Sequence, residues 1–134
     1  MLRLDHVALE VSDLDAAIVF YTKKLALTLK TPKHIDEEQH EAFAFLELEG
    51  GNIELLQRLD DENQPIPMEP QALCASLCPH VAIGTPDIAV AMGRLTREGV
   101  PIIKGPLEIP GKVRWLYAND PDNNIIEFVQ WLEE

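Results

Sequence analysis

The stretch Pro79-His80-Val81-Ala82-Ile83 repeats, almost residue for residue, the stretch Asp5-His6-Val7-Ala8-Leu9 near the start of the chain. At nearly the same distance after each histidine comes a strand-like run with a glutamate in its middle, Glu54 in the first case and Glu127 in the second. Self-similarity of this kind indicates a duplicated structural unit. The sequence therefore predicts an internal duplication that carries four candidate ligands.

The size and composition of the chain fit one domain, or two small modules that share a core. Its 134 residues lie within the common domain length of about 100 to 150. The hydrophobic content of 46% and the charged content of 25% are those of an ordinary soluble globular protein. No apolar run approaches the roughly 20 residues that a membrane-spanning helix needs, so we expect no membrane span.

The charge and the cysteines restrict the partners and the compartment. A formal net charge of −12 repels phosphate backbones, and the 11 Lys and Arg residues form no continuous basic stripe, so nucleic acid is not an expected partner. Cys74 and Cys78 lie four residues apart, which suits two reduced thiols better than a disulfide framework. The N-terminus lacks the pattern of a secretory signal. We therefore expect a cytoplasmic protein that acts on a small molecule.

Each half of the sequence predicts a strand, a helix and three further strands. In the first half the strands are expected at 4–11, 27–35, 42–48 and 52–57, with a helix from about 14 to 25. In the second half the helix is expected from 88 to about 98, followed by a strand at 102–103, a loop at 105–111 and strands at 112–117 and 124–131. The predicted fold class is α+β, with βαβββ modules at 1–59 and 78–134 joined by a proline-rich linker at 60–77.

Polar residues recur at matching positions inside the predicted strands. The matched polar residues are His6 and His80, Glu54 and Glu127, and Gln57 and Gln130. Alone, a strand histidine is usually a hydrogen-bonded structural residue or an exposed one, and a strand glutamate usually lies on a solvated face. Imidazole nitrogen and carboxylate oxygen together, however, suit divalent ions such as Fe, Co, Ni, Mn or Zn. Because both residue types recur in pairs, we favour a metal site.

Several of these motifs together resemble a known superfamily over nearly the whole chain outside the linker. The paired βαβββ plan, the two histidine strands, Phe20-Tyr21 in the first helix and Asp120-Pro121-Asp122-Asn123-Asn124-Ile125-Ile126-Glu127 resemble the vicinal oxygen chelate superfamily, which has the glyoxalase/bleomycin resistance/extradiol dioxygenase fold. The resemblance implies tandem modules whose curled mixed sheet surrounds a metal cleft. It also implies one divalent ion (Ni, Co, Fe, Mn or Zn) held by His6, Glu54, His80 and Glu127.

The sequence departs from the pattern of the superfamily at two turns. Ala26 stands where a glycine usually ends the first helix, and Asn123 replaces the usual glycine of the DPDGN turn. Asparagine tolerates the left-handed conformation, so the second change is mild.

The ligand set distinguishes branches of the superfamily. By resemblance, glyoxalase I and methylmalonyl-CoA epimerase use four protein ligands, whereas extradiol dioxygenases and fosfomycin resistance proteins use two histidines and one carboxylate. Glu54 therefore favours the proton-transfer branch, in which a metal-stabilised enolate forms while Glu54 or Glu127 acts as the base. The expected function is a glyoxalase-like (lactoylglutathione lyase-like) or epimerase-like lyase or isomerase. The alternatives are an extradiol-type dioxygenase and a non-catalytic drug-binding resistance protein.

The substrate is less well defined than the reaction. Glu10 and Ile109 stand where bacterial glyoxalases I typically have an arginine and a lysine, which argues against glutathione, while the stretch 38–56 resembles methylmalonyl-CoA epimerase. Three basic residues are candidates for binding a substrate carboxylate or phosphate: Arg58, Lys112 and Arg114. A symmetric homodimer is the expected assembly, and the metal site would lie within one chain or across the dimer interface.

Overall fold

The computed structural model describes residues 1–132 and has two tandem βαβββ modules, as predicted. The first contains β1 (His6–Glu10), α1 (Leu14–Val19), a π-helical turn η1 (Phe20–Lys24), β2 (Thr28–Asp36), β3 (Glu41–Leu48) and β4 (Gly51–Arg58). The second contains β5 (His80–Gly84), α2 (Ile88–Arg97), β6 (Ile102–Ile109), β7 (Val113–Asn119) and β8 (Ile125–Trp131). Contacts divide the chain into two compact units after Pro70, inside the segment predicted as a linker.

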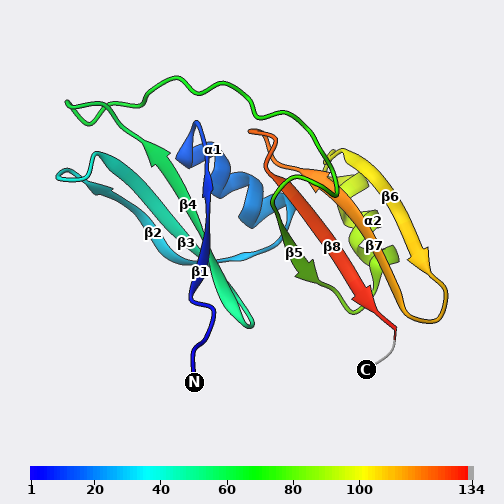
Figure 1. The fold of residues 1–134 in the computed structure, drawn as a ribbon. Coiled ribbons are helices and arrows are strands. Elements are labelled where there is room, and N and C mark those ends of the chain that lie inside the picture. Colours follow the sequence, from blue (N-terminus) through cyan, green and yellow to red (C-terminus); the bar gives the residue numbers. More distant parts are fainter. Residues whose placement is uncertain (133–134) are drawn as a thin grey trace. The chain divides into compact units, whose positions relative to one another are not determined.

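Each module forms its own four-stranded mixed sheet, and the two sheets share one topology (Figure 1). The strand order is β1-β4-β3-β2 in the first sheet and β5-β8-β7-β6 in the second. The first and last strands of each module pair in parallel, and the other pairs are antiparallel. This pairing places Ala8 beside Glu54 and Ala82 beside Glu127. Each histidine strand therefore lies directly beside a glutamate strand.

One face of the first sheet packs on α1 (Figure 1), and the other carries the predicted ligands of this module, His6 and Glu54. Side chains alternate between the two faces of a strand. On the α1 side, Leu46 and Leu55 are fully buried and Ile53 nearly so, and burying each such side chain stabilises the fold by about 1.5–3 kcal/mol. On the opposite face, Phe45 and Glu54 are only half-buried. The alternation thus separates the core from a face that ligands can reach.

The repeated glutamines anchor the helices to the sheets. The Gln57 side chain accepts a hydrogen bond from the backbone N–H of Leu14 at 3.3 Å, and its amide donates to the carbonyl of Ser12 at 2.9 Å. Gln130 accepts from the N–H of Ile88 at 2.9 Å. The first backbone N–H groups of a helix have no partner inside the helix. The duplicated glutamine therefore has a structural role and does not belong to the candidate ligand set.

At the two turns where the sequence departs from the superfamily pattern, the residue in place of glycine adopts the left-handed conformation. Ala26 has φ 61° and Asn123 has φ 64°, which confirms the expected conformation of Asn123 in the turn before β8. The buried carboxylate of Asp120 organises this turn, since it accepts hydrogen bonds from the backbone N–H groups of Asp122 and Asn124 at 2.9 and 2.8 Å. The turn thereby fixes the start of β8, the strand that carries Glu127.

The predicted loop at 105–111 is wrong over most of its length, because β6 continues to Ile109. Gly105 and Pro106 led to the loop assignment, but β6 is an edge strand of its sheet. An edge strand tolerates proline because one side of it donates no ladder hydrogen bonds. Within residues 1–132, no helix has the length and apolar character that crossing a membrane requires.

Candidate functional site

In the first module, His6 and Glu54 face each other on the half-buried side of the sheet. His6 Nε2 lies 3.4 Å from Glu54 Oε1, and the side chains are 37% and 16% exposed. The ring of Phe45, which lies opposite Glu54 in the β3–β4 register, packs edge-on against the imidazole with centroids 5.2 Å apart. An aromatic edge contact fixes the plane of the imidazole beside the carboxylate.

The second module repeats this arrangement. His80 Nε2 lies 2.9 Å from Glu127 Oε1, and the side chains are 22% and 15% exposed. Tyr117 lies opposite Glu127 in the β7–β8 register and packs edge-on against the His80 ring at 5.4 Å. The duplication therefore includes a histidine, a glutamate and an aromatic ring in the same mutual geometry.

The second nitrogen of each imidazole is held by an oxygen acceptor. His6 Nδ1 lies 2.7 Å from the Asp5 carboxylate, and His80 Nδ1 lies 2.7 Å from the backbone carbonyl of Cys78. Carboxylate and carbonyl oxygens only accept, so each Nδ1 must carry the hydrogen. In the neutral imidazole, each Nε2 then presents a lone pair to a glutamate oxygen. Because a lone pair on Nε2 and a carboxylate oxygen repel each other at this distance, either a proton on one of them or a cation bound by both must compensate.

A divalent ion fits this donor set. Ligand atoms about 2.1 Å from an ion and at right angles to each other lie roughly 3.0 Å apart, and tetrahedral ligands lie roughly 3.4 Å apart. The two Nε2···Oε1 distances, 2.9 and 3.4 Å, lie in this range, and the shorter one is also a hydrogen-bond distance. Metal-binding histidines also typically donate their other N–H to a carboxylate or a backbone carbonyl, as both histidines do here.

Neighbouring groups shift the pKa values of Asp5 and Cys78, the two residues whose oxygen atoms contact the imidazoles. The hydrogen bond from His6, assisted by the charge of Arg3, lowers the pKa of Asp5 below its ordinary value, so this carboxylate stays ionised and accepting. The Cys74 thiol interacts with that of Cys78 and raises the pKa of Cys78. Cys78 therefore remains a neutral thiol at ordinary pH and contributes to the site through its backbone carbonyl.

The predicted ligands come together two by two. His6 and Glu54 form one pair and His80 and Glu127 the other, and each pair lies within one unit. Across residues 1–132, no three His, Cys, Asp or Glu side chains are clustered closely enough to hold an ion.

The three predicted substrate-binding residues occupy different surroundings. Arg58 follows Glu54 on the same face of β4 and pairs with Glu10 at 3.3 Å, at the edge of a pocket of about 180 Å³. Arg114 lies opposite Gln130 in the β7–β8 register, on the face of the sheet away from Glu127, and pairs with Glu108 at 3.3 Å. Lys112 is exposed in the turn between β6 and β7. Only Arg58 shares a sheet face with a candidate ligand.

Sequence reasoning missed the residues that orient the histidines. Asp5 was visible as the neighbour of His6, although nothing in the sequence distinguished it from an ordinary surface carboxylate. The pairing of Phe45 with His6 depends on strand register, which the sequence specifies only indirectly. The Cys78 carbonyl left no trace in the sequence, because every residue has one.

Comparisons with known proteins found related sequences and structures. The family model of the glyoxalase/bleomycin resistance protein/dioxygenase superfamily matches residues 3–128. Virulence protein STM3117 of Salmonella typhimurium is 29% identical over 97% of this chain and 85% of that protein, and its crystal structure has a TM-score of 0.66 and covers 98% of each chain.

Two further relatives carry glyoxalase names. A protein named probable lactoylglutathione lyase, from Vibrio parahaemolyticus, is 30% identical over 96% of this chain and 90% of that protein. The structure of a glyoxalase family protein from Bacillus cereus has a TM-score of 0.76 and 21% identity, with 99% of this chain and 96% of that chain covered. At this identity the likeness concerns the fold.

Proposed function

Because this chain belongs to the glyoxalase/bleomycin resistance protein/dioxygenase superfamily, we propose that it is a divalent-metal-dependent lyase or isomerase. Its reaction moves a proton next to the carbonyl or thioester group of a small molecule. The relative named probable lactoylglutathione lyase supports the lyase assignment. The two free thiols, Cys74 and Cys78, suit the reducing cytoplasm as its compartment.

The observation that carries the proposal is the duplicated pairing of a histidine with a glutamate. In both modules an imidazole with its hydrogen on Nδ1 presents Nε2 to a carboxylate oxygen. The same three residue types, a histidine, a glutamate and an aromatic ring, meet in both modules, which supports a role beyond the packing of a single strand. We propose that His6, Glu54, His80 and Glu127 together hold one Ni, Co, Fe, Mn or Zn ion. Such an ion would supply Lewis acidity, which stabilises negative charge on a substrate carbonyl oxygen.

We assign the proton transfer to the glutamates, and to Glu54 first. Both carboxylates are similarly shielded, at 16% and 15% exposed. Glu54 lies farther from its histidine, at 3.4 Å compared with 2.9 Å for Glu127, and its partner His6 is the more exposed imidazole. A more loosely held carboxylate moves more readily towards a substrate hydrogen. Glu54 would take the proton and return it to the product, while Glu127 stays a ligand.

The two alternative functions predict different roles for Glu54. An extradiol-type dioxygenase would need only His6, His80 and Glu127 as ligands, so the pairing of Glu54 with His6 would be incidental. A non-catalytic drug-binding protein would need no base. The equivalence of Glu54 and Glu127 in register and partners supports the four-ligand enzyme over both alternatives.

The test uses Glu54→Gln, which keeps the shape of the side chain and removes its basicity. Metal-loaded protein in D₂O is incubated with methylmalonyl-CoA, or with glutathione and methylglyoxal, and deuterium uptake is followed by NMR. We expect exchange with one of these substrates, and a loss of about 100-fold or more in the variant, because general bases commonly contribute 10²–10⁴-fold. Glu62→Gln, an exposed residue with the same charge change, should retain full activity.

Other outcomes would replace the proposal. If the Glu54→Gln variant exchanged deuterium as fast as the unmodified protein, Glu54 would not be the general base. Ring cleavage of a catechol without exchange would indicate the dioxygenase. Saturable ligand binding without any turnover would indicate the resistance protein.

A further inference from the structure

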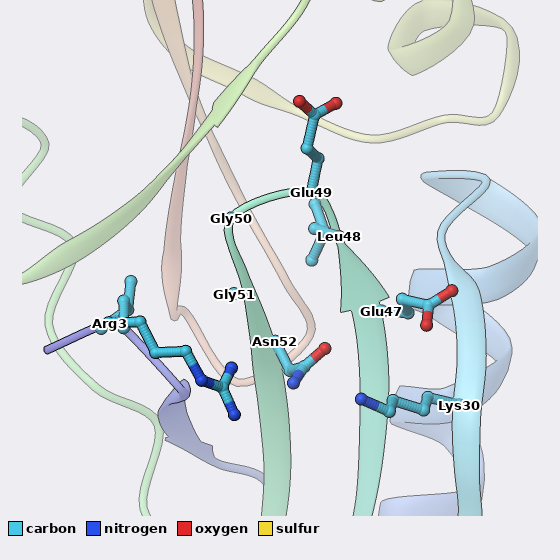
Figure 2. A pocket seen from close by; sticks show the side chains of 9 residues that line it. Arg3, Lys30, Glu47, Leu48, Glu49, Gly50, Gly51 and Asn52 are labelled. Carbon is cyan, nitrogen blue, oxygen red and sulfur yellow. The ribbon is translucent and has the colours of Figure 1, made fainter. Parts of the chain in front are cut away.

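A second feature of the first module is a pocket of about 530 Å³ at the end of the β3–β4 hairpin (Figure 2). Its lining includes Arg3 before β1, Lys30 on β2 and Asn52 at the start of β4. In Figure 2 the Arg3 guanidinium and the Lys30 ammonium extend towards one another across the Asn52 amide. Three groups that donate hydrogen bonds, two of them cationic, therefore converge on one pocket.

Lys30 reaches the pocket through an irregularity in its strand. Leu29 pairs with Leu46 and Thr31 with Phe45, so Lys30 is an extra residue without a partner in the register. A bulge of this kind redirects the side chain of the extra residue. Lys30 is exposed and makes no hydrogen bond or ion pair within residues 1–132. Its charge acts on the Asp5 carboxylate only at a distance, where it helps to lower the pKa of that group, so its three N–H groups remain open to a ligand.

Arg3 and Asn52 are positioned by the contacts of Leu4 and Asp5. The backbone and side chain of Leu4 approach Gly51 so closely that an added Cβ there would lie 3.3 Å from both. The Asp5 carbonyl accepts hydrogen bonds from the backbone and side-chain N–H groups of Asn52, at 2.9 and 3.2 Å. The Arg3 guanidinium donates one hydrogen bond to the Asp5 carboxylate, at 3.3 Å, and has four further N–H groups that can donate to a ligand.

Two carboxylates also line the pocket but point away from its donors. Glu47 and Glu49 are exposed, and Figure 2 shows both carboxylates directed away from the Lys30 ammonium and the Arg3 guanidinium. The chain as a whole carries a charge of −12. An anion is therefore repelled by most of the surface, and a local pair of cations decides where it binds.

The second module gives an internal comparison, because it has the same fold without these donors. The three equivalent positions hold Leu77, Ile103 and Ile125. Ile103 occupies a matching irregularity in β6, between Ile102 and Lys104. The βαβββ fold thus tolerates apolar residues at all three positions. The basic and amide groups of the first module are not required for folding.

We infer that the pocket of Arg3, Lys30 and Asn52 binds an oxyanion, a carboxylate or phosphate group of the substrate. This inference rests on the proposed function for its link to catalysis. Asn52 precedes Glu54 by two residues on the same face of β4, a spacing of about 7 Å along a strand. The substrate class is therefore a small carbonyl or thioester compound whose anionic group lies roughly that far from the carbon that loses its proton.

The experiment measures anion binding directly, with chelator-treated protein so that metal binding and turnover play no part. Inorganic phosphate and succinate are titrated separately into ¹⁵N-labelled protein and followed by NMR shifts. We expect saturable shifts at Gly51 and Asn52, and an increase in Kd of about tenfold or more for Lys30→Met, since a hydrogen bond to a charged group is lost. Arg3→Gln should weaken binding likewise, and both residues are exposed, so the variants should fold.

The matched control is Lys33→Met on the same strand. Lys33 pairs with Asp15 at 3.2 Å and does not line the pocket, yet its loss changes the net charge equally. Equal weakening by Lys30→Met and Lys33→Met, or no saturable shift at Gly51 and Asn52 with either anion, would overturn the inference. Saturable, Lys30-dependent binding in a protein that never binds metal would uphold the anion site and overturn the proposed function alone.

Discussion

Replacing Asp5 with asparagine should weaken metal binding without unfolding the protein. The Asp5 carboxylate accepts the His6 Nδ1 hydrogen at 2.7 Å, and this bond keeps the lone pair of Nε2 directed at Glu54. Loss of such a partner typically costs 10–100-fold in metal affinity. Because the Asp5 side chain is 62% exposed, water screens its charge, and we expect the lower end of that range, a loss of about tenfold in metal affinity.

The assay is a titration with Ni²⁺ or Zn²⁺ against a competing chelator at fixed ionic strength. Asp15→Asn is the control, since it removes the same charge from another exposed site, one that pairs with Lys33. Affinity within twofold of the unmodified protein for Asp5→Asn would refute the orienting role of Asp5. An equal loss in Asp15→Asn would show that net charge alone governs the affinity.

Three further predictions concern stability and assembly. Ala26→Gly should raise the free energy of unfolding by about 1 kcal/mol in urea denaturation, because φ 61° strains alanine but not glycine; an unchanged midpoint would contradict this. Gln57→Leu should lower that free energy by roughly 1–3 kcal/mol, because it removes the hydrogen bonds to Leu14 and Ser12, whereas no change would exclude the anchoring role. If the proposed site spans two chains of a homodimer, mixing the His6→Ala and His80→Ala proteins should restore one intact site in each mixed dimer. Such a dimer should then have half of the activity of an unmodified dimer. If the site lies within one chain, mixing the two variants should restore no activity.

The duplication made most of the fold predictable. Two copies of one pattern identified the strands of His6 and His80 and their partners, because each copy corroborated the other. The prediction was wrong in β6, where Gly105 and Pro106 gave a local turn pattern that the edge position of the strand overrides. Local sequence does not report whether a strand lies at the edge of its sheet.

The site was predictable only where side-chain chemistry repeats. His6 with Glu54 and His80 with Glu127 could be paired from the repeat, but their orienting partners differ, a side chain in one module and a backbone carbonyl in the other. The placement of Arg114 on the opposite face from Glu127 follows from register, which a one-residue shift would reverse. The positive charge of Arg114 made it a candidate for binding substrate, but charge does not tell on which face of the sheet a residue lies.

The most direct test of the central claim is the metal content of the protein after equilibrium dialysis against Ni²⁺, Co²⁺, Fe²⁺, Mn²⁺ or Zn²⁺. If His6, Glu54, His80 and Glu127 hold one ion together, the unmodified protein should bind about one ion per chain with at least one of these metals, and His6→Ala and His80→Ala should each lose it. Two ions per chain, with only one lost in each variant, would mean that the two pairs act separately. That result, or full retention of metal by both variants, would contradict the shared four-ligand centre.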